Sequence, residues 1–442
     1  MATSSRRHLT LDDWLGWFET HHPKKIDLSL ERIAAVLERL DLRHPPFKVI
    51  TVAGTNGKGS CVAMLESIYW HAGYTVGAFT SPHLWRFNER VRLNGADAGD
   101  AELVELLETI DDARGTITLT YFEASTAVAL LHFARSEVDV AVLEVGMGGR
   151  LDSSNAVDAD CALIVSIDLD HREWLGPDRE AIGREKAGIV RRGRPVVVAD
   201  RDPPRSLLEH AAAEGAVVAL IGRDFDYRRA GLGWHRIGDA DSAPPLPLPE
   251  FGGDEQLGNA AACAAVTESL RADLPVGDAA LAAGIRHAYL RGRFERHEVG
   301  AVEWVFDVAH NPAAAEILRS SISRLPPRRT LAVFAAMRDK DLPGVLAPFV
   351  GSVDEWFVTQ ANADRGATGA ELRDVLAAVG ARGVTVSADV AAACASARSA
   401  ARPGDRVVVF GSFHTVGVAT DSLGLYFAPP PRGTPPARWT RV

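Results

Sequence analysis

The chain has 442 residues, of which 47% are hydrophobic and 24% charged, and its formal net charge at pH 7 is −10. This length predicts two globular domains, the acidic balance argues against a nucleic-acid-binding surface, and no apolar run approaches the roughly 18 residues of a membrane span. The four cysteines have no CxxC spacing, so they predict buried thiols, and we expect a cytoplasmic protein with small-molecule partners.

The first predicted strand, residues 49–52, ends in a glycine-rich turn at residues 54–60, and a helix is predicted over residues 61–71. Glycines at 54, 57 and 59 let backbone N–H groups converge on phosphate oxygens, while Lys58 adds a positive charge and Ser60 a hydroxyl for a metal ion. The usual P-loop pattern has a glycine where Val52 stands and Ser or Thr where Gly59 stands. A plain strand-to-helix turn is therefore the alternative to a nucleotide site.

Further apolar strands are predicted at 75–79, 138–145, 162–167, 195–199 and 216–221, and helical stretches separate them. This alternation predicts βαβ units and a doubly wound, mostly parallel sheet. Ligands of such sheets gather at the carboxyl ends of the strands. The turn at 54–60 and the segments after residues 79 and 145 all lie at such ends.

The pattern then changes to short, proline-containing segments over 222–253, which predict a small β insertion, and a helix is predicted over 257–270. A second series of strands, at 302–308, 330–334, 355–358, 384–386 and 406–410, predicts a smaller, Rossmann-like α/β domain. We therefore expect an ATP-binding domain over 1–290, a second domain over 296–428 and a disordered tail rich in proline and arginine over 429–442.

Polar residues at the predicted strand ends indicate metal chemistry. Ser81 follows the strand at 75–79 and offers an oxygen to a hard cation, although a Ser-Pro turn is an equal alternative. Glu144 ends a buried strand, where a bare carboxylate is unfavourable, so it predicts a magnesium ligand in preference to a salt bridge. His171 is a candidate second-metal ligand or base, and its alternative is a hydrogen-bonding strand cap.

Other candidates are weaker when each is taken alone. From sequence alone Arg90, a candidate partner for a carboxylate, and Lys186, at a helix end, are both predicted to be surface charges. Asp307, His310 and Asn311 follow a strand within six residues and suit ribose or carboxylate recognition and proton handling. Arg293 and Lys340 are candidate partners for a triphosphate.

Together these segments resemble the folylpolyglutamate synthase and dihydrofolate synthase family of the Mur ligase superfamily over nearly the whole chain. The resemblance rests on the turn at 54–60 and on the segments 22–28, 80–84, 88–91, 120–123, 144–152, 185–189, 307–312 and 411–412. It implies an ATP-dependent carboxylate-amine ligase that joins L-glutamate to 7,8-dihydropteroate and to folates through an acyl phosphate. A folylpolyglutamate synthase without the first activity and a non-catalytic ATP-binding module are the alternatives.

The resemblance also implies roles for individual residues. The implied ATP contacts are Gly54, Thr55, Asn56, Gly57, Lys58, Gly59, Ser60, Asn259, Arg293 and Asp307; the implied metal ligands are Ser81 and Glu144 for one Mg²⁺ and Glu144 and His171 for a second. The implied pterin contacts are Ile26, Thr120, Phe122 and Asp152, and the implied glutamate contacts are Arg90, His310 and Ser412. Lys58, His310 and Lys186 are the implied catalytic residues, and Lys186 matches a lysine that the family can carry as a carbamate.

Three residues depart from the family pattern. Val308 occupies the place of a glycine, Arg291 occupies the place of a proline before Arg293, and Glu255 stands where a histidine is common. None of them removes a group that the chemistry needs, although they affect the expected nucleotide geometry. A monomer is the default expectation.

Overall fold

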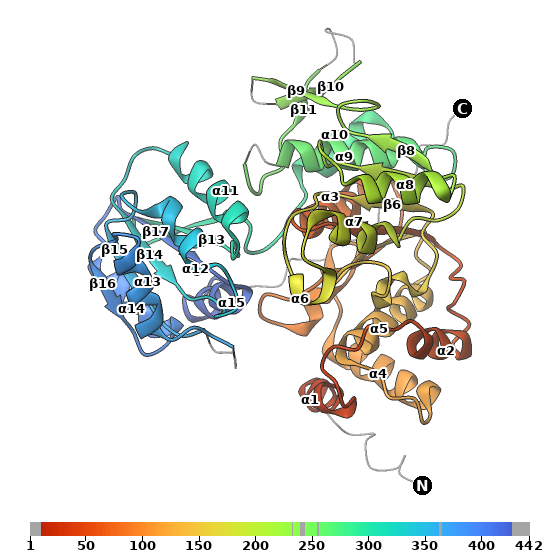
Figure 1. Cartoon of the computed structure of the whole chain (residues 1–442), viewed down its shortest axis with the longest axis horizontal. Helices are drawn as coiled ribbons and strands as arrows, with labels where there is room; N and C mark the ends of the chain where they lie inside the picture. Colours follow the sequence, from red (N-terminus) through yellow and green to blue (C-terminus); the bar gives the residue numbers. More distant parts are fainter. Residues whose placement is uncertain (1–9, 232, 239–243, 254–255, 362–364, 427–442) are drawn as a thin grey trace.

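The computed structural model describes residues 10–231, 233–238, 244–253, 256–361 and 365–426. These residues form two α/β lobes that lie beside one another (Figure 1). The tail predicted over 429–442 lies outside the described residues.

The first lobe is built on an eight-stranded sheet of order β4-β3-β2-β5-β1-β6-β7-β8. Its strands are β1 Lys48–Ala53, β2 Val76–Phe79, β3 Val91–Leu93, β4 Ala96–Asp97, β5 Val140–Glu144, β6 Cys161–Ile164, β7 Pro195–Val198 and β8 Val217–Leu220. The six neighbouring strands β2-β5-β1-β6-β7-β8 pair in parallel. Strands β3 and β4 extend the sheet beyond β2 as an antiparallel edge. The central β1 pairs with β5 so that Val52 lies opposite Glu144, which brings the glutamate beside the turn that follows β1.

Helices cover both faces of this sheet because its strands are apolar on both faces. One face, with Ile50 and Val52, packs against α3 Lys58–His71, α9 Gln256–Ser269 and α10 Asp278–Arg286. The other face packs against α1 Leu11–His21, α2 Glu31–Arg39, α4 Asp100–Arg114 and α5 Tyr121–Arg135 near β1, β2 and β5, and against α7 Arg179–Ala187 and α8 Arg205–Ala213 near β6 and β7. Helix α3 is buried over most of its length, which explains its apolar composition.

Three short antiparallel strands lie within the segment expected to hold a β insertion. They are β9 Tyr227–Ala230, β10 Gly233–Arg236 and β11 Leu246–Pro247. The buried indole of Trp234 donates a hydrogen bond to the Pro247 carbonyl at 2.9 Å and packs into the core that includes α9 and α10. This small sheet therefore extends the first lobe.

The second lobe is a six-stranded sheet of order β12-β13-β17-β14-β15-β16, in which β12 alone is antiparallel. Its strands are β12 Glu295–Val299, β13 Val302–Asp307, β14 Thr330–Phe334, β15 Glu355–Val358, β16 Val384–Val386 and β17 Arg406–Phe410. Helices α11 Pro312–Ser323, α12 Leu342–Leu346 and α13 Gly369–Ala378 cover one face, and α14 Val390–Ala400 and α15 Phe413–Ser422 cover the other. Two mixed α/β sheets with mainly parallel strands confirm the predicted fold class.

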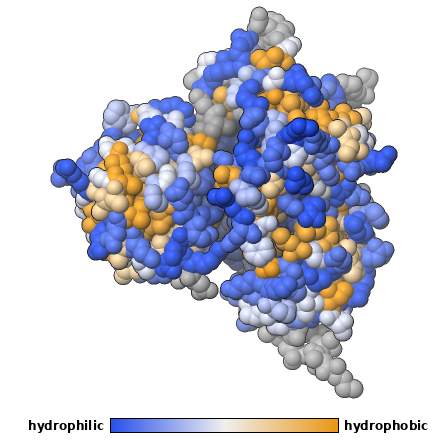
Figure 2. All heavy atoms as spheres, viewed as in Figure 1, coloured by the Kyte–Doolittle hydropathy of each residue, from blue (hydrophilic) through white to orange (hydrophobic). Residues whose placement is uncertain are grey.

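The two lobes face each other through the carboxyl ends of their strands. In the second sheet Asp307 lies opposite Phe410, so the segments after β13 and β17 are neighbours. Asn311 donates to the Asn56 side chain at 3.2 Å, and Lys340 pairs with Asp170 at 3.2 Å across the lobes. Figure 2 shows a mainly hydrophilic face that is hollowed between the lobes. No helix in the described part of the chain is long and apolar enough to cross a membrane.

Candidate functional site

The glycine-rich turn joins the end of β1 directly to α3. Helix α3 begins at Lys58, three residues earlier than predicted, and Gly57 precedes it in the left-handed region with φ +88°. A Cβ at Gly57 would lie 2.8 Å from the side chains of both Asn259 and Val165, so neither its conformation nor its space admits another residue. The turn is tied to the segment after β6, because the Thr55 N–H donates to the Ser166 carbonyl at 2.7 Å. The N–H groups at the start of α3 can then donate hydrogen bonds to phosphate oxygens.

Two lysines converge on one carbonyl of this turn. The Nζ atoms of Lys58 and Lys186 each donate to the Gly54 carbonyl at 3.0 Å. Lys186 is only 4% exposed, so the alternative that it is a surface charge is wrong. Burial, with Lys58 as the second cause, lowers the pKa of Lys186 to about 7. A neutral Lys186 amine is therefore accessible near neutral pH.

Glu144 is a buried carboxylate at the end of β5. It is 5% exposed, forms no ion pair with any described residue, and accepts a hydrogen bond from the Ser81 N–H at 3.1 Å. Burial raises its pKa, and the charge of Lys58 opposes that rise. A carboxylate buried in this way calls for a cation, so Glu144 with the adjacent Ser81 hydroxyl fits a hard divalent ion.

His171 is placed less favourably for metal binding. It precedes the short helix α6 Arg172–Leu175 with φ +49°, its side chain is 45% exposed, and its Nε2 lies 3.8 Å from the Asp170 carboxylate. Burial lowers its pKa. The described residues contain no group of three or more His, Cys, Asp or Glu side chains arranged around one point, so a second ion would need ligands from the substrates or from modified Lys186.

A cavity of about 560 Å³ lies between the lobes and collects most of the predicted substrate residues. It is lined by Ile26, Ser81, Arg90, Thr120, Phe122, Asp152, His171, His310 and Ser412. We call it the substrate cavity. Residues expected to bind pterin, metal and glutamate thus share one space, although they come from segments nearly 400 positions apart.

The predicted pterin residues differ in whether their side chains already form hydrogen bonds within the protein. Phe122 packs on the glycine segment after β5, where a Cβ at Gly146 would lie 2.5 Å from its ring, and its ring is 5.7 Å from that of Phe79. Asp152 is buried and accepts hydrogen bonds from the Ser154 N–H and hydroxyl and from the Met147 N–H. Phe122 therefore offers an aromatic wall, whereas Asp152 mainly holds the loop.

The remaining pterin candidates, Thr120 and Ile26, also line the substrate cavity. Thr120 caps α5 by accepting from the Glu123 N–H at 3.2 Å, within a reciprocal capping box. Ile26 is 40% exposed and borders the substrate cavity. An exposed isoleucine beside an aromatic wall suits a flat, partly apolar ligand.

Arg90 is a buried cation that lines the same cavity. It is 8% exposed and lies in the 3-10 turn η1 Phe87–Arg90, with its guanidinium 5.5 Å from the ring of Tyr121. Its Nε donates to Nδ1 of His83 at 2.9 Å. Burial and the neighbouring Arg90 lower the pKa of His83 to about 3, so that imidazole is neutral.

The second lobe contributes His310 and Ser412 to the cavity. His310 Nδ1 lies 2.9 Å from the Val308 carbonyl, which assigns the proton to Nδ1 and leaves Nε2 as an acceptor. Burial lowers the pKa of His310 to about 4. Ser412 caps α15, where its hydroxyl accepts from the Thr415 N–H at 3.1 Å.

A second cavity, of about 600 Å³, lies on the β6 side of the phosphate loop and brings together Asn56, Gly57, Asn259, Arg293 and Asp307. We call it the nucleotide cavity. The Asp307 carboxylate accepts from the N–H groups of Phe294 and Ala309 at 2.9 and 2.8 Å, which ties it to the segment between the lobes. The predicted nucleotide contacts thus come together beside the phosphate loop.

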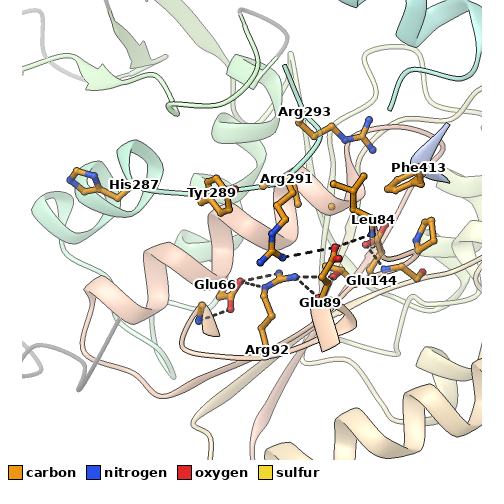
Figure 3. Close-up of a pocket in the computed structure, with 16 residues that line it drawn as sticks. Glu66, Leu84, Glu89, Arg92, Glu144, His287, Tyr289, Arg291, Arg293 and Phe413 are labelled. Carbon is orange, nitrogen blue, oxygen red and sulfur yellow. Dashed lines mark hydrogen bonds and ion pairs between the residues drawn. The ribbon is translucent and has the colours of Figure 1, made fainter. Parts of the chain in front are cut away.

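A smaller cavity of about 310 Å³ beside Glu144 contains a charge network (Figure 3) that the sequence did not reveal. Arg92 pairs with Glu66 at 3.0 Å, and Glu89 accepts from three consecutive N–H groups, those of Leu84, Trp85 and Arg86, at 2.7 to 2.8 Å. Glu89 therefore anchors the loop that carries Ser81. Its position in the segment Asn-Glu-Arg was the one available signal.

The departure at Arg291 belongs to the same network. Arg291 pairs with Asp97 at 2.9 Å and lies 5.2 Å from the ring of Tyr426, whose hydroxyl donates to Glu89 at 2.9 Å. Arg291 thus forms an ion pair with Asp97 of the first lobe and a cation–π contact with Tyr426, which follows the last helix of the second lobe. The departure at Val308 is accommodated as well, because its side chain is fully buried in the core of the second lobe.

Comparison with known proteins gives consistent matches along the chain. Residues 52–231 match the Mur ligase middle domain, and residues 292–413 match the Mur ligase glutamate ligase domain. A dihydrofolate synthase/folylpolyglutamate synthase of Escherichia coli (strain K12) is 43% identical over 92% of this chain and 94% of its own length.

Solved structures agree with the sequence matches. The structure of E. coli FolC in complex with DHPP and ADP has a TM-score of 0.87 and 41% identity, covering 95% of this chain and 98% of that chain. A bifunctional folylpolyglutamate synthase/dihydrofolate synthase with Mn, AMPPNP and L-glutamate bound has a TM-score of 0.86 and 41% identity, covering 95% and 99%.

Proposed function

The chain belongs to the dihydrofolate synthase/folylpolyglutamate synthase family of Mur ligases, which makes it an ATP-dependent amide-bond ligase, and we propose that it acts on two acceptors. It joins L-glutamate to 7,8-dihydropteroate and to tetrahydrofolate or its polyglutamates. The observation that carries this proposal is the substrate cavity, in which Phe122, Arg90 and His310 line one space between the lobes. ATP, L-glutamate and the two acceptors are the proposed small-molecule partners.

The nucleotide and its metal fit the residues around the phosphate loop. Lys58, the N-terminus of α3 and the nucleotide cavity would hold ATP, and Ser81 and Glu144 would hold one Mg²⁺. When bound, the ion neutralises negative charge on the phosphate oxygens. A second ion would use Glu144 and His171. The buried, unpaired state of Glu144 supports the first ion more directly than the half-exposed His171 supports the second.

The reaction has two steps. The acceptor carboxylate attacks the γ-phosphate of ATP, which forms an acyl phosphate and ADP. The amine of L-glutamate then attacks the acyl carbon, and inorganic phosphate leaves as the amide forms. Lys58 and the α3 N–H groups stabilise charge on the transferring group, and positioning of the reactants supplies much of the rate. Because water would hydrolyse an acyl phosphate, we infer that the lobes close when substrates are bound.

His310 contributes to the second step by a narrower role than general base catalysis. A pKa of about 4 makes its imidazole a weak proton acceptor, but the Nε2 lone pair can accept a hydrogen bond from the glutamate amine and orient it. We expect His310→Ala to lower kcat by about 10- to 100-fold. Wild-type kcat at saturating glutamate in this variant would remove His310 from the catalytic residues.

Lys186 is proposed to act as a carbamate. Its neutral amine would add to CO₂ and release one proton, and the resulting anion would lie beside Lys58. This change would replace two like charges at the Gly54 carbonyl with an ion pair and would supply a ligand for the second metal ion. Stimulation of the wild-type activity by bicarbonate would support the proposal if Lys186→Met lacks this stimulation.

The decisive experiment measures ATP-dependent phosphate release with L-glutamate and Mg²⁺, using 7,8-dihydropteroate or tetrahydrofolate as acceptor and mass spectrometry to identify products. Turnover of both acceptors would support the two-acceptor function. Turnover of tetrahydrofolate alone would leave only chain extension. ATP binding without amide product would favour a binding module. We further propose a cytoplasmic monomer, and light scattering in solution checks the monomer.

A further inference from the structure

Arg90 is a buried cation that lacks a carboxylate partner among the described residues. Its guanidinium lies 6.0 Å from the ring centroid of Phe87 and 5.5 Å from that of Tyr121, and the side chain borders the substrate cavity. Burying a guanidinium without a counter-ion is unfavourable, so its presence at a cavity wall indicates an anionic ligand. The direction of the Arg90 N–H groups, however, depends on a neighbouring residue.

Among the described residues, the Arg90 side chain forms a hydrogen bond only with His83. Nε of Arg90 donates to Nδ1 of His83 at 2.9 Å, and this donor requires a free lone pair on Nδ1, with the imidazole proton on Nε2. Neither Nη1 nor Nη2 of Arg90 has a hydrogen-bond partner in the described part of the chain. Because the guanidinium is planar, the hydrogen bond that holds Nε also restricts the direction of both terminal nitrogens.

His83 is itself held firmly. It lies on the loop whose following N–H groups, those of Leu84, Trp85 and Arg86, all donate to the Glu89 carboxylate at 2.7 to 2.8 Å. The same short segment therefore carries Glu89, which fixes the loop, and Arg90, which the loop orients. The loop that Glu89 fixes therefore also places the His83 Nδ1 acceptor against the Arg90 guanidinium.

We propose that His83 is a positioning residue for the amine substrate: by accepting the Nε hydrogen bond, it turns Nη1 and Nη2 of Arg90 toward the substrate cavity as a fork for a carboxylate of L-glutamate. Paired N–H groups of arginine match the two oxygens of a carboxylate. The inference rests on the proposed function, because the carboxylate belongs to the glutamate that the ligase consumes. His83 has no role in the acyl phosphate step.

The test uses steady-state kinetics of His83→Ala and His83→Asn. Asparagine can present its Oδ1 near the position of Nδ1, so it can restore the acceptor. We expect His83→Ala to raise KM for L-glutamate roughly 10- to 100-fold, as for loss of a hydrogen bond to a charged group. KM for ATP and for dihydropteroate should stay within twofold, and His83→Asn should recover most of the loss. Trp85→Ala, a change on the same loop at a side chain that is 40% exposed, is the matched control.

A double-mutant comparison separates positioning from general damage. If His83 acts through Arg90, the variant with both His83→Ala and Arg90→Ala should have the same KM for glutamate as Arg90→Ala alone. Additive losses, equal increases in all three KM values, or an unchanged KM for glutamate would each overturn the inference. Failure of His83→Asn to restore the KM would also overturn it.

Hydroxylamine distinguishes failure of this inference from failure of the proposed function. It is an amine without a carboxylate, and it would displace phosphate from the acyl phosphate to give a hydroxamate. The wild type and His83→Ala should form the hydroxamate at similar rates, since this nucleophile does not use the Arg90 fork. Absence of hydroxamate with the wild type would overturn the proposed acyl phosphate, whereas a slower rate only in His83→Ala would overturn the positioning role.

Discussion

The nucleotide cavity and the substrate cavity lie toward β6 and β5, on either side of the central strand, and they are built differently. In the nucleotide cavity, polar groups already bond to one another, as between Asn56 and Ser166 and between Arg179 and Asp200. In the substrate cavity, Arg90 is buried without a carboxylate partner among the described residues. The substrate cavity therefore contains a buried charge that a substrate can neutralise.

Because the two cavities differ in this way, we expect substitutions in them to change different kinetic constants. A site formed by backbone N–H groups and fixed side chains serves the nucleotide, which takes part whichever acceptor is used, so changes there should affect kcat for both acceptors. A site that pairs a buried charge with a substrate should instead affect the KM of that substrate. The predictions below test this division, in order of decreasing effect.

Lys58→Ala should have the largest effect. Removal of the ammonium group beside the phosphate-binding turn should lower kcat by roughly 10³-fold with either acceptor, because electrostatic stabilisation of the transferring phosphate is lost. Lys48→Ala, at the opposite end of β1 where Lys48 pairs with Asp160 and Asp273, is the control and should keep near wild-type activity. A loss in Lys58→Ala that is confined to one acceptor would contradict the division.

Glu144→Gln should lower kcat by about 10²-fold, because a neutral amide holds a divalent ion more weakly than a carboxylate does. Its amide oxygen can still accept from the Ser81 N–H. Titration of activity with Mg²⁺ measures the effect, and the apparent Mg²⁺ requirement should rise for both acceptors. An unchanged requirement would show that Glu144 is not a metal ligand.

Phe122→Leu should change the choice of acceptor. Since the ring forms a wall of the substrate cavity, its loss should lower kcat/KM for dihydropteroate about tenfold relative to tetrahydrofolate. Gly146→Ala offers a second route to the same wall, because its Cβ would displace the Phe122 ring. Equal losses for the two acceptors in both variants would contradict a role for this wall in choosing between them.

The difference in metal-free stability between Glu144→Gln and the wild type should depend on pH. Burial raises the pKa of Glu144, so the folded protein loses stability as pH rises above the ordinary value of 4.5 and this carboxyl ionises. Glutamine does not ionise, so the variant should melt a few degrees higher than the wild type at pH 7 without metal. The gap should narrow as pH falls toward 4, where both states bind the proton. Mg²⁺ should raise the melting temperature of the wild type more than that of the variant.

Asp170→Asn should have the smallest effect. It removes the ion pair with Lys340 between the lobes, a contact between partly exposed side chains that contributes less than about 1 kcal/mol. We expect a slightly larger radius of gyration in solution scattering without ligands and less than a fivefold change in kcat. Arg338→Ala, which breaks an exposed pair with Glu371 within the second lobe, is the control. Identical scattering curves would show that this pair does not hold the lobes together.

The strands that carry the site could be predicted because buried parallel strands are apolar over their whole length. The antiparallel edges β3, β4 and β12 were not predicted, since short edge strands carry little pattern. The start of α3 was predicted three residues late because Gly57 and Gly59 on either side of Lys58 are unfavourable in a helix interior, although the first turn of a phosphate-binding helix accommodates Gly59.

The roles of some individual side chains could likewise be predicted from sequence, and those of others could not. Glu144 could be identified from sequence because a carboxylate at the end of an apolar strand is unusual. Lys186 and Arg90 could not, because a lysine at a helix end and an arginine in a polar segment look the same whether they are buried or exposed. Both are buried here, and residues more than a hundred positions away from Lys186 supply its hydrogen-bond partner.

The two α/β lobes, the phosphate-binding turn and the family could be predicted from the amino-acid order, because each depends on local pattern or on motifs in a fixed order. The folded arrangement was needed to show that Lys58 and Lys186 meet at one carbonyl, that His83 bonds to Arg90, and that Arg291 contacts both lobes. Burial and the pairing of charges depend on what lies nearby in space. For these residues the neighbours come from distant segments, and no local pattern contains them.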